Sequence, residues 1–411
     1  MSTFKDFLKE YCPNGVKQYK LQDICKKFKG TPGITATLMK QIANPAGDID
    51  IFAGGKTHVK AFERDIPNAN IRKDPSCLIQ SRGIIDCIYC DSKYTFKNEM
   101  WSYSPKDAKV NIKYVYYFLK TQLSHLRQVA AMRSSMPQIS LADTDFLRVP
   151  LPPLEVQEKI VTVLDAFAEL ESELESELED RNKQYGFYRK KLIKNGVPKV
   201  PLKDLIAITN GVEHKKLGEI FNLRNGYTPS TKNEAFWKNG NLPWFTMKDL
   251  RANGRILSDS IEHITCEGVR GSLFPKDSII LATTATIGEH ALITTDFLCN
   301  QQFTAFSAKP QYATRLLPMY AFYCFFSVDE WCKKHIAAST FPSISTDMLK
   351  DVEIPLPPLE TQKEIADVLD KFTSLTSSMK VGIPAEISLR RKQMDWYRDA
   401  MFKALYGEDE K

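Results

Sequence analysis

The chain has 411 residues, more than a single hydrophobic core usually serves, so at least two domains are expected. Hydrophobic residues account for 43% and charged residues for 26% of the sequence, which is typical of a globular protein and argues against extensive disorder. The net charge of +6 permits an anionic partner such as DNA but does not require one.

Neither a targeting segment nor a metal site is indicated. No run approaches the ~20 apolar residues of a membrane span, and the N-terminus lacks the apolar core of a signal peptide, so a cytoplasmic protein is expected. The nine cysteines form an odd, scattered set, which indicates reduced thiols. Cys87 and Cys90 form one C-x-x-C pair, but two further zinc ligands at motif spacing do not follow. We therefore expect no metal and no cofactor.

A short opening segment occurs twice in the chain. Residues 14–24 (NGVKQYKLQDI) match residues 210–220 (NGVEHKKLGEI) at an offset of 196 residues. Each copy leads into a region that differs strongly between the copies, roughly residues 25–140 and 221–345. The segments that border the variable regions were therefore duplicated and stayed similar, while the variable regions themselves diverged.

The first variable region is expected to combine strands and helices. Residues 76–80 (SCLIQ) and 84–90 (IIDCIYC) are short apolar runs bounded by turn residues, as buried strands are. Residues 110–126 are rich in aromatic side chains and predict a core helix. Residues 53–57 (AGGKT) resemble the end of a phosphate-binding loop, but the first glycine of that motif would fall on Asp50. Because an aspartate there opposes a phosphate, ATP binding is not expected.

A proline-rich hinge ends each variable region and starts a long helix. Residues 150–167 and 355–372 share 12 of 18 positions, and both Pro150 to Pro355 and Phe167 to Phe372 give an offset of 205 residues. Paired prolines are tolerated only at the first turn of a helix, so helices are expected to begin near Leu154 and Leu359.

The first helix carries a narrow apolar seam with alternating steps of four and three residues from Ile160 to Leu192, which is typical of a coiled coil. The second helix follows the same seam to Ile383 and then gains four residues around Gly382 and Pro384, so a kink or break is expected there. Each helix needs a partner, and chain order favours an antiparallel pair with neighbouring chain termini. The residues expected to pair the helices are Ile160, Leu164, Phe167, Leu174, Leu178, Tyr185, Tyr188, Ile365, Leu369, Phe372, Met379, Met394 and Tyr397.

An acidic run occupies part of the first helix. Residues 169–180 (ELESELESELED) hold seven carboxylates in twelve residues. The simplest interpretation is a solvated helix face, and a basic protein partner is the alternative. DNA phosphates would be repelled from this face.

The second variable region repeats the mixed pattern. Residues 278–283 (SIILAT) and 291–295 (ALITT) predict strands, and residues 315–336 predict another aromatic-rich core helix. Residues 241–244 (NLPW) are the nearest match to a methyltransferase motif, but no glycine-rich strand-turn-helix precedes them. No cluster of nuclease carboxylates recurs in both halves, so no catalytic residue is proposed.

Polar turns with basic neighbours recur in both variable regions. Arginine reads guanine edges, asparagine and glutamine read adenine edges, and lysine or small hydroxyl residues hold phosphates. The candidate DNA-binding residues on this pattern are Lys56, Arg72, Lys73, Gln80, Ser81, Arg82, Lys248, Arg251, Arg255, Thr283, Thr284, Thr286, Asn300, Gln301 and Gln302.

Taken together, the hinge PLPPLExQxxI, the long helices and the K-Q-x-x-x-Y-R segments (residues 183–189 and 392–398) resemble the specificity subunit of type I restriction-modification enzymes. Residues 242–250 and 277–303 also resemble common recognition-domain segments. The resemblance implies two target recognition domains that each read half of a split double-stranded DNA sequence, with the helices spanning the unread spacer. It also implies no catalytic activity, docking of two methyltransferase subunits, and motor-nuclease restriction subunits in the full complex.

The expected fold is therefore α+β, with two similar globular recognition domains separated by two long antiparallel coiled-coil helices in a pseudo-two-fold repeat. The expected boundaries are residues 1–150 for the first domain, 151–196 for the first helix, 197–355 for the second domain and 356–411 for the second helix. A tandem coiled-coil scaffold that binds proteins instead of DNA is the alternative.

Overall fold

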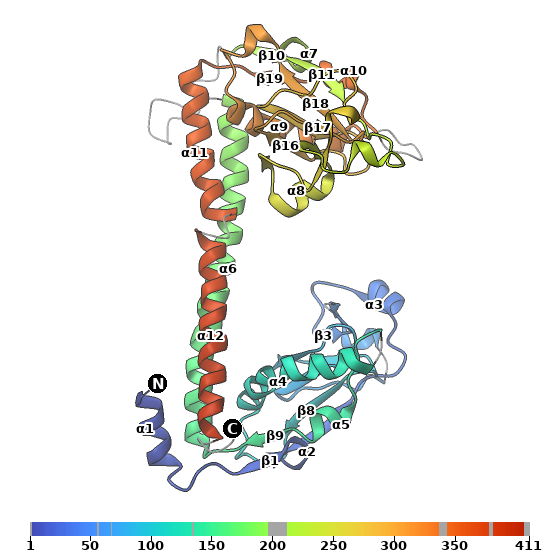
Figure 1. Ribbon diagram of the computed structural model, residues 1–411. Coiled ribbons are helices and arrows are strands. Elements are labelled where there is room, and N and C mark those ends of the chain that lie inside the picture. The colour runs from blue at the N-terminus through green and yellow to red at the C-terminus, as the bar shows by residue number, and fades with distance from the viewer. Residues whose placement is uncertain are drawn as a thin grey trace. The chain divides into compact units, whose positions relative to one another are not determined.

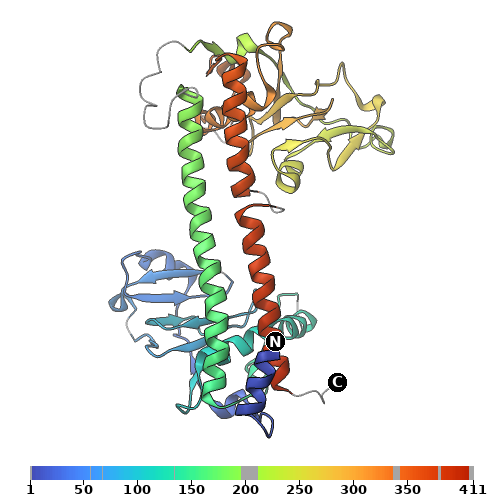
Figure 2. The same cartoon turned by 90° about the vertical axis from the view of Figure 1, so that its left-hand side faces the viewer.

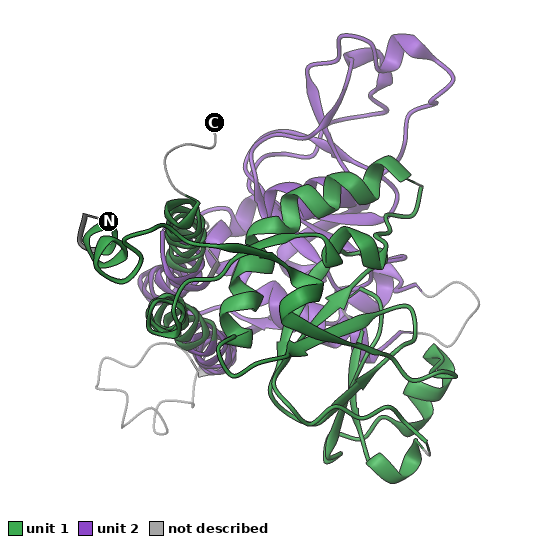
Figure 3. Ribbon diagram, turned by 90° about the horizontal axis from the view of Figure 1, so that it is seen from below, with its two compact units in different colours: residues 1–175, 386–411 green, residues 176–385 purple. Residues whose placement is uncertain are grey.

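The computed structural model describes residues 2–55, 57–66, 68–133, 135–195, 212–336, 343–377 and 381–406. The chain divides into two compact units (Figure 3). Unit 1 comprises residues 1–175 and 386–411, and unit 2 comprises residues 176–385. Both termini thus belong to unit 1. Among the described residues, no helix combines the length and the apolar character that a bilayer crossing requires.

Unit 1 is a mixed α+β domain built on a four-stranded sheet in the order β2-β8-β5-β6, with a smaller sheet in the order β4-β3-β7 (Figure 1). A long helix, α4, packs against β5 and β6. The elements of this unit are α1 (Ser2–Tyr11), β1 (Gln18–Lys20), α2 (Leu21–Ile24), β2 (Cys25–Lys29), α3 (Ala36–Ile42), β3 (Ile49–Phe52), β4 (His58–Ala61), β5 (Ser76–Gln80), β6 (Asp86–Cys90), β7 (Tyr94–Phe96), β8 (Trp101–Pro105), α4 (Ile112–Arg133), α5 (Leu141–Asp145) and β9 (Arg148–Pro150).

Unit 2 repeats the strand order of unit 1 and adds one strand, β13, at the edge of its larger sheet, although its sequence differs. Its larger sheet has the order β11-β18-β15-β16-β13 and its smaller sheet the order β14-β12-β17, with α9 packed against β15 and β16. The elements are β10 (His214–Lys216), α7 (Leu217–Ile220), β11 (Phe221–Asn225), β12 (Leu242–Phe245), α8 (Met247–Asn253), β13 (Ile256–Leu257), β14 (Glu262–Ile264), β15 (Ser278–Ala282), β16 (His290–Ile293), β17 (Leu298–Cys299), β18 (Phe303–Ala308), α9 (Pro318–Lys334), α10 (Thr346–Lys350) and β19 (Glu353–Pro355).

The strand pairings of the two small sheets confirm this equivalence. In unit 1, β3 pairs antiparallel with β4 and parallel with β7. In unit 2, β12 pairs antiparallel with β14 and parallel with β17. The opening segment also pairs with the hinge in each unit, through β1 with β9 and β10 with β19. One topology therefore occurs twice, and the strands and core helices expected from the apolar runs are confirmed.

The long helices follow the hinges as expected. Helix α6 runs without interruption from Leu154 to Asn195, and its residues are divided between the two units. The second copy is broken into α11 (Leu359–Ser377) and α12 (Ile383–Leu405). Gly382 between them has φ +87°, and a Cβ atom there would lie 2.5 Å from the carbonyl oxygen of Leu375. The expected break at the four-residue insertion is confirmed.

One glutamine that is repeated in both hinges has a direct structural role. Gln157 is fully buried, and its Oε1 accepts a hydrogen bond from the Asn111 backbone N–H at 2.9 Å. Its Nε2 donates to the carbonyl oxygens of Lys109 and Pro152, both at 2.9 Å. In unit 2, Gln362 makes the same three bonds to Leu317, Arg315 and Pro357. The glutamine that both hinges share therefore satisfies loop backbone groups that would otherwise be buried without partners.

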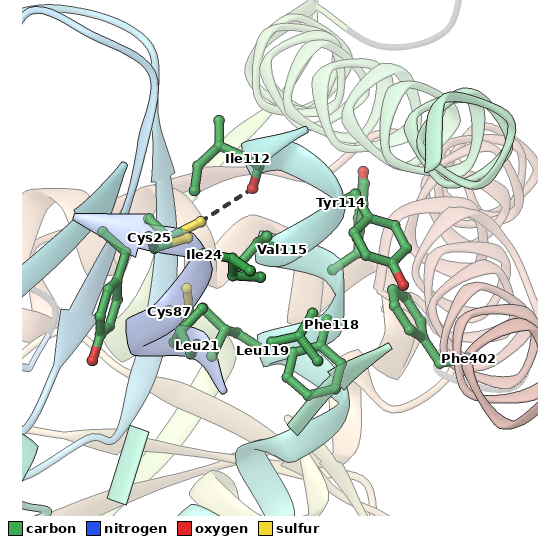
Figure 4. Close-up of a cluster of buried hydrophobic side chains, with 14 of the residues drawn as sticks. Leu21, Ile24, Cys25, Cys87, Ile112, Tyr114, Val115, Phe118, Leu119 and Phe402 are labelled. Atoms are coloured by element: carbon green, nitrogen blue, oxygen red, sulfur yellow. Dashed lines mark hydrogen bonds between the residues drawn. The ribbon is translucent and has the colours of Figure 1, made fainter. Parts of the chain in front are cut away.

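The helices enter the domain cores as well as pairing with each other. Ile160 and Leu164 share a buried cluster with α4 and with Met401, Phe402 and Leu405 of α12. Figure 4 shows Phe402 beside Tyr114, with ring centroids 5.1 Å apart. Ile365 and Leu369 likewise lie in the core of unit 2 with residues of α6 and α9. Sequence periodicity alone did not separate core contacts from helix pairing.

Beyond the cores, the aromatic positions pair the helices in each unit. In unit 1, Phe167 of α6 stacks on Tyr397 of α12 at 5.3 Å, and Arg391 binds Glu171 and Glu175 at 2.5 Å each. Residue numbers rise along one helix as they fall along the other, so this pair is antiparallel. In unit 2, Tyr188 of α6 stacks on Phe372 of α11 at 5.8 Å.

The remaining seam positions are less enclosed. Leu174 and Leu178 are half-buried, and Met394 packs beside the core of unit 1. Met379 lies outside the described residues. Leu8 of α1 shares the cluster that holds Met401 and Leu405, and Figure 2 shows α1 beside the end of α12. The first helix and the last helix therefore meet, as expected from the repeat.

Candidate nucleic-acid interface

Each unit carries a hairpin loop that is hydrogen-bonded to a neighbouring turn, which comprises residues 97–99 in unit 1 and residues 300–302 in unit 2. In unit 1 the loop of residues 81–85 joins β5 to β6, and Ser81 Oγ donates to the Glu99 carbonyl oxygen at 2.5 Å. In unit 2 the loop of residues 283–289 joins β15 to β16, and the Thr283 backbone N–H donates to the Gln302 carbonyl oxygen at 2.9 Å. The loop and the turn therefore form one surface in each unit.

A third segment closes against the same loop. In unit 1, Gly83 N–H donates to the Pro137 carbonyl at 2.8 Å, and Ile139 N–H donates to the Ser81 carbonyl at 2.9 Å. In unit 2, Ile344 N–H donates to the Thr283 carbonyl at 2.9 Å. The segment after the core helix thus borders the hairpin loop in both units.

A glycine allows a fourth segment to approach the turn closely. A Cβ atom on Gly30 would lie 2.4 Å from the Lys97 carbonyl oxygen, and one on Gly226 would lie 2.3 Å from the Asn300 carbonyl oxygen. The next residues of unit 2 continue along the turn, because Thr228 Oγ1 donates to Gln301 Oε1 at 2.5 Å. Gly30 and Gly226 are separated by 196 residues, the offset of the opening segments, and this shared spacing is a sequence signal that could have revealed the contact.

The polar candidates of unit 2 are brought together by these contacts. Thr283 is buried, Thr284 and Thr286 are half-buried, and Gln301 is exposed. Asn300 Oδ1 accepts from the Gln302 backbone N–H at 3.1 Å, and its Nδ2 donates to Gln302 Oε1 at 3.2 Å. Gln301 is therefore the amide that faces solvent, while Asn300 and Gln302 shape the turn.

The three basic candidates of unit 2 differ in how exposed their side chains are and in how firmly they are ion-paired. Lys248 (75% exposed) and Arg251 (62% exposed) make ion pairs with Glu262 at 3.3 Å and Glu289 at 3.4 Å. Exposed pairs of this kind contribute little to stability and can exchange for phosphate contacts. Arg251 also lies at the hairpin loop through Glu289.

Arg255 is held more firmly, since it is 34% exposed and lies 3.1 Å from the buried carboxylate of Asp329. Asp329 also binds His290 Nδ1 at 2.7 Å, directly after the hairpin loop. Burial lowers the pKa of His290, although the Asp329 carboxylate opposes that shift. The charged form of the imidazole is therefore disfavoured at this position, directly after the loop.

The candidates of unit 1 are divided between structural and accessible positions. Gln80 is buried, and its amide donates to the Gly55 carbonyl at 2.6 Å. Arg72 lies over the Phe28 ring at 3.3 Å, so its guanidinium is largely occupied within the domain. Lys73 and Arg82 are exposed. Lys56 lies outside the described residues.

Three comparisons with known proteins bear on this interface. The family described as "Type I restriction modification DNA specificity domain" matches residues 13–181 and 209–389. The specificity subunit of the EcoprrI type I restriction enzyme from Escherichia coli is 45% identical over 48% of this chain, and the match spans about half of that protein, 51%. The EcoR124I/EcoR124II specificity subunit from Escherichia coli is 34% identical over 72% of each chain.

Solved structures show a similar fold. A chain from a study of complex assembly and conformational transition in a type I restriction-modification system has a TM-score of 0.62 and 16% identity, covering 95% of this chain and 98% of that one. The S subunit of a type I system from M. genitalium has a TM-score of 0.50 and 17% identity, covering 95% and 96%.

Proposed function

Because the chain belongs to the family of type I restriction modification DNA specificity proteins, we propose that it is the DNA-recognition subunit of a type I restriction-modification complex. Each recognition domain reads one half of a bipartite, asymmetric target. The observation that carries this proposal is the repeated surface of hairpin loop, turn and flanking segment, on which equivalent strands and hydrogen bonds hold loops of different length and different side chains in the two units.

A change of loop side chains on a shared sheet topology is what two different half-sites require. Thr284, the second residue of the hairpin loop in unit 2, is replaced by Arg82 in unit 1. Guanidinium and amide groups prefer guanine and adenine edges respectively. Lys248 and Arg251 supply exposed charges that can neutralise phosphates and fix the register of the protein on the duplex.

The proposed subunit recognises DNA but does not modify or cut it. Its partners are two methyltransferase subunits, which supply adenine methylation, and restriction subunits, which join the full complex. The repeated helices are the natural docking sites for two copies of one partner, because their surfaces recur while the recognition surfaces differ. The helices also set the length of the unread spacer between the half-sites.

Binding and activity of the purified chain test this proposal together. Its affinity for duplex DNA should fall with increasing salt, with a logarithmic slope of about −0.9 for each neutralised phosphate. The chain alone should transfer no labelled methyl group and should leave plasmid DNA uncut. Methyl transfer by the chain alone, or DNA binding that is indifferent to salt, would contradict the proposed role.

A further inference from the structure

The turn of residues 97–99 in unit 1 occupies the position that residues 300–302 occupy in unit 2. Lys97 N–H donates to the Phe52 carbonyl at 3.1 Å, at the end of β3, and Asn300 N–H donates to the Phe245 carbonyl at 3.0 Å, at the end of β12. Each turn closes with the same backbone bond, from Met100 to Lys97 at 3.0 Å and from Phe303 to Asn300 at 3.1 Å.

The carbonyl of the third residue of each turn also accepts a hydrogen bond from the first residue of the hairpin loop. The Glu99 carbonyl accepts from the Ser81 hydroxyl, and the Gln302 carbonyl accepts from the Thr283 backbone N–H. Three equivalent contacts fix the alignment, so Lys97, Asn98 and Glu99 correspond to Asn300, Gln301 and Gln302. The sequence conceals this correspondence because none of the three residue pairs is identical.

We propose that the turn of residues 97–99 is a specificity-determining element of unit 1, with Asn98 as its base-reading side chain. This inference rests on the proposed function, since it assigns residues to one half of the DNA target. Asn98 is exposed and has no hydrogen-bond partner among the described residues. Its counterpart Gln301 is the exposed amide of the second turn.

The chemistry of the two turns predicts different half-sites. The Asn98 amide offers one donor and one acceptor, which match N7 and N6 of adenine in the major groove. Lys97 and Glu99 are paired at 3.0 Å on either side of it. On DNA, Lys97 can turn to a phosphate and Glu99 can accept from N4 of cytosine. The exposed Arg82 on the adjoining loop adds a guanine-reading group to the same surface.

Two reciprocal variants test the assignment. The full chain is co-expressed with the methyltransferase subunit of its own system, and methylated adenines are mapped across the host genome. In Asn98→Ala, base preference at one or two positions of one half-site should fall about 5- to 150-fold, while the other half-site is unchanged. Gln301→Ala should reduce base preference in the other half-site and leave the first half-site unchanged. Gln128→Ala, which removes another exposed amide of unit 1, should change neither half-site.

The outcomes separate this inference from the function on which it rests. If the wild-type chain yields a bipartite target but Asn98→Ala leaves both halves unchanged, the assignment of the turn is wrong and the proposed function stands. The assignment is also wrong if Asn98→Ala alters the same half-site as Gln301→Ala, or if modification is lost at every site. A wild-type chain without any bipartite target would overturn both proposals.

Discussion

At the scale of single residues, Gln157 and Gln362 explain why the two hinges kept the same glutamine. Each side chain uses its oxygen and its amide nitrogen to bind three backbone groups of buried loops. Removing such a side chain leaves those groups without partners, which costs more than the net value of the hydrogen bonds themselves. The hinge is thereby fixed against the domain from which its helix departs.

We predict that Gln157→Ala destabilises unit 1 by about 2–4 kcal/mol, because it orphans one N–H and two carbonyl groups and leaves a cavity. Equilibrium chemical denaturation of the full chain measures the loss. Gln128→Ala, on the exposed face of α4, should change the free energy of unfolding by less than about 0.5 kcal/mol. Equal effects of the two substitutions would refute the role given to Gln157.

His290 gives unit 2 a defined dependence on pH. Its pKa in the folded protein lies below its unfolded value, chiefly because burial disfavours the charged ring. The unfolded chain therefore binds the proton more readily, and the stabilisation present above about pH 6.5 is lost as the pH falls below that value. The free energy of unfolding should decrease from pH 7.5 to 5.5, by at most about 1.4 kcal/mol per pH unit for this group.

Replacement of the histidine isolates its contribution. His290→Asn should flatten the pH dependence of unit 2 unfolding, whatever it does to stability at pH 7.5. His214→Asn, which removes an exposed histidine of the same unit, should leave the slope as it is. An unaltered slope in His290→Asn would show that another group governs the acid response.

Residue chemistry predicted the candidate interface only in part. Arg82 is exposed in the hairpin loop and Gln301 in the turn, as a solvent-facing role requires, whereas Lys73 is exposed but precedes β5, at the strand end opposite the hairpin loop. Gln80 ends a strand that is buried along its whole length, and Arg72 lies on the Phe28 ring. Whether a polar side chain faces inward depends on the strand's neighbours, which a local pattern of residue types does not specify. Asn98 was missed because its equivalence to Gln301 is carried by the hydrogen bonds of the turn and not by residue identity.

At the scale of elements, both helix pairs present one exposed aromatic ring at equivalent positions. Phe187 and Trp396 are each 58% exposed, each precedes the Tyr-Arg of a K-Q-x-x-x-Y-R segment, and each packs edge-on against that tyrosine. The tyrosines in turn stack on Phe372 and Phe167 respectively. Large exposed rings supported by a packed neighbour are typical anchors of protein interfaces.

We predict that Phe187→Ala and Trp396→Ala each weaken the proposed docking of one methyltransferase subunit by about 2 kcal/mol or more, which is roughly a 30-fold loss of affinity. Analytical ultracentrifugation of the complex at limiting concentration should then show one bound subunit in place of two. Leu389→Ala, a control at a half-exposed apolar position of α12, should retain both. If the double variant that combines Phe187→Ala with Trp396→Ala still bound two methyltransferase subunits, these rings would be excluded as anchors.

The helices and strands were the most predictable elements. The prolines of the hinge set the starts of α6 and α11, and the inserted residues with Gly382 set the break before α12. The apolar seam was interpreted only as a helix-pairing face. Some of its residues also belong to domain cores, namely Ile160, Leu164, Ile365 and Leu369. A period of 3.5 residues identifies an apolar face but not which neighbour covers it.

At the scale of the whole molecule, the proposed spacing function depends on helix length. An insertion of four residues adds about one helical turn, or ~6 Å, which corresponds to roughly two base pairs of B-form DNA. Inserting four residues after Glu175 in α6 and after Ala385 in α12 should therefore lengthen the unread spacer by about two base pairs. The two half-site sequences should stay the same.

The same insertion distinguishes helices that set the spacer length from helices that only pair with each other. Genomic methylation by the variant complex reports the new spacer directly. Insertion in α6 alone serves as the control, since mismatched helices should reduce methylation without creating a uniform new spacing. Methylation that persists only at the original spacing in the double insertion would contradict the proposed role of the helices.

The central claim is that two units with one topology and different loops read two halves of one DNA target. A genome-wide map of methylated adenines in a host that expresses the chain with its methyltransferase subunit tests it most directly. We predict a single bipartite motif, with two different specific half-sites separated by a spacer of fixed length and free sequence. A continuous motif, a motif with two identical halves, or no adenine methylation at all would contradict the account.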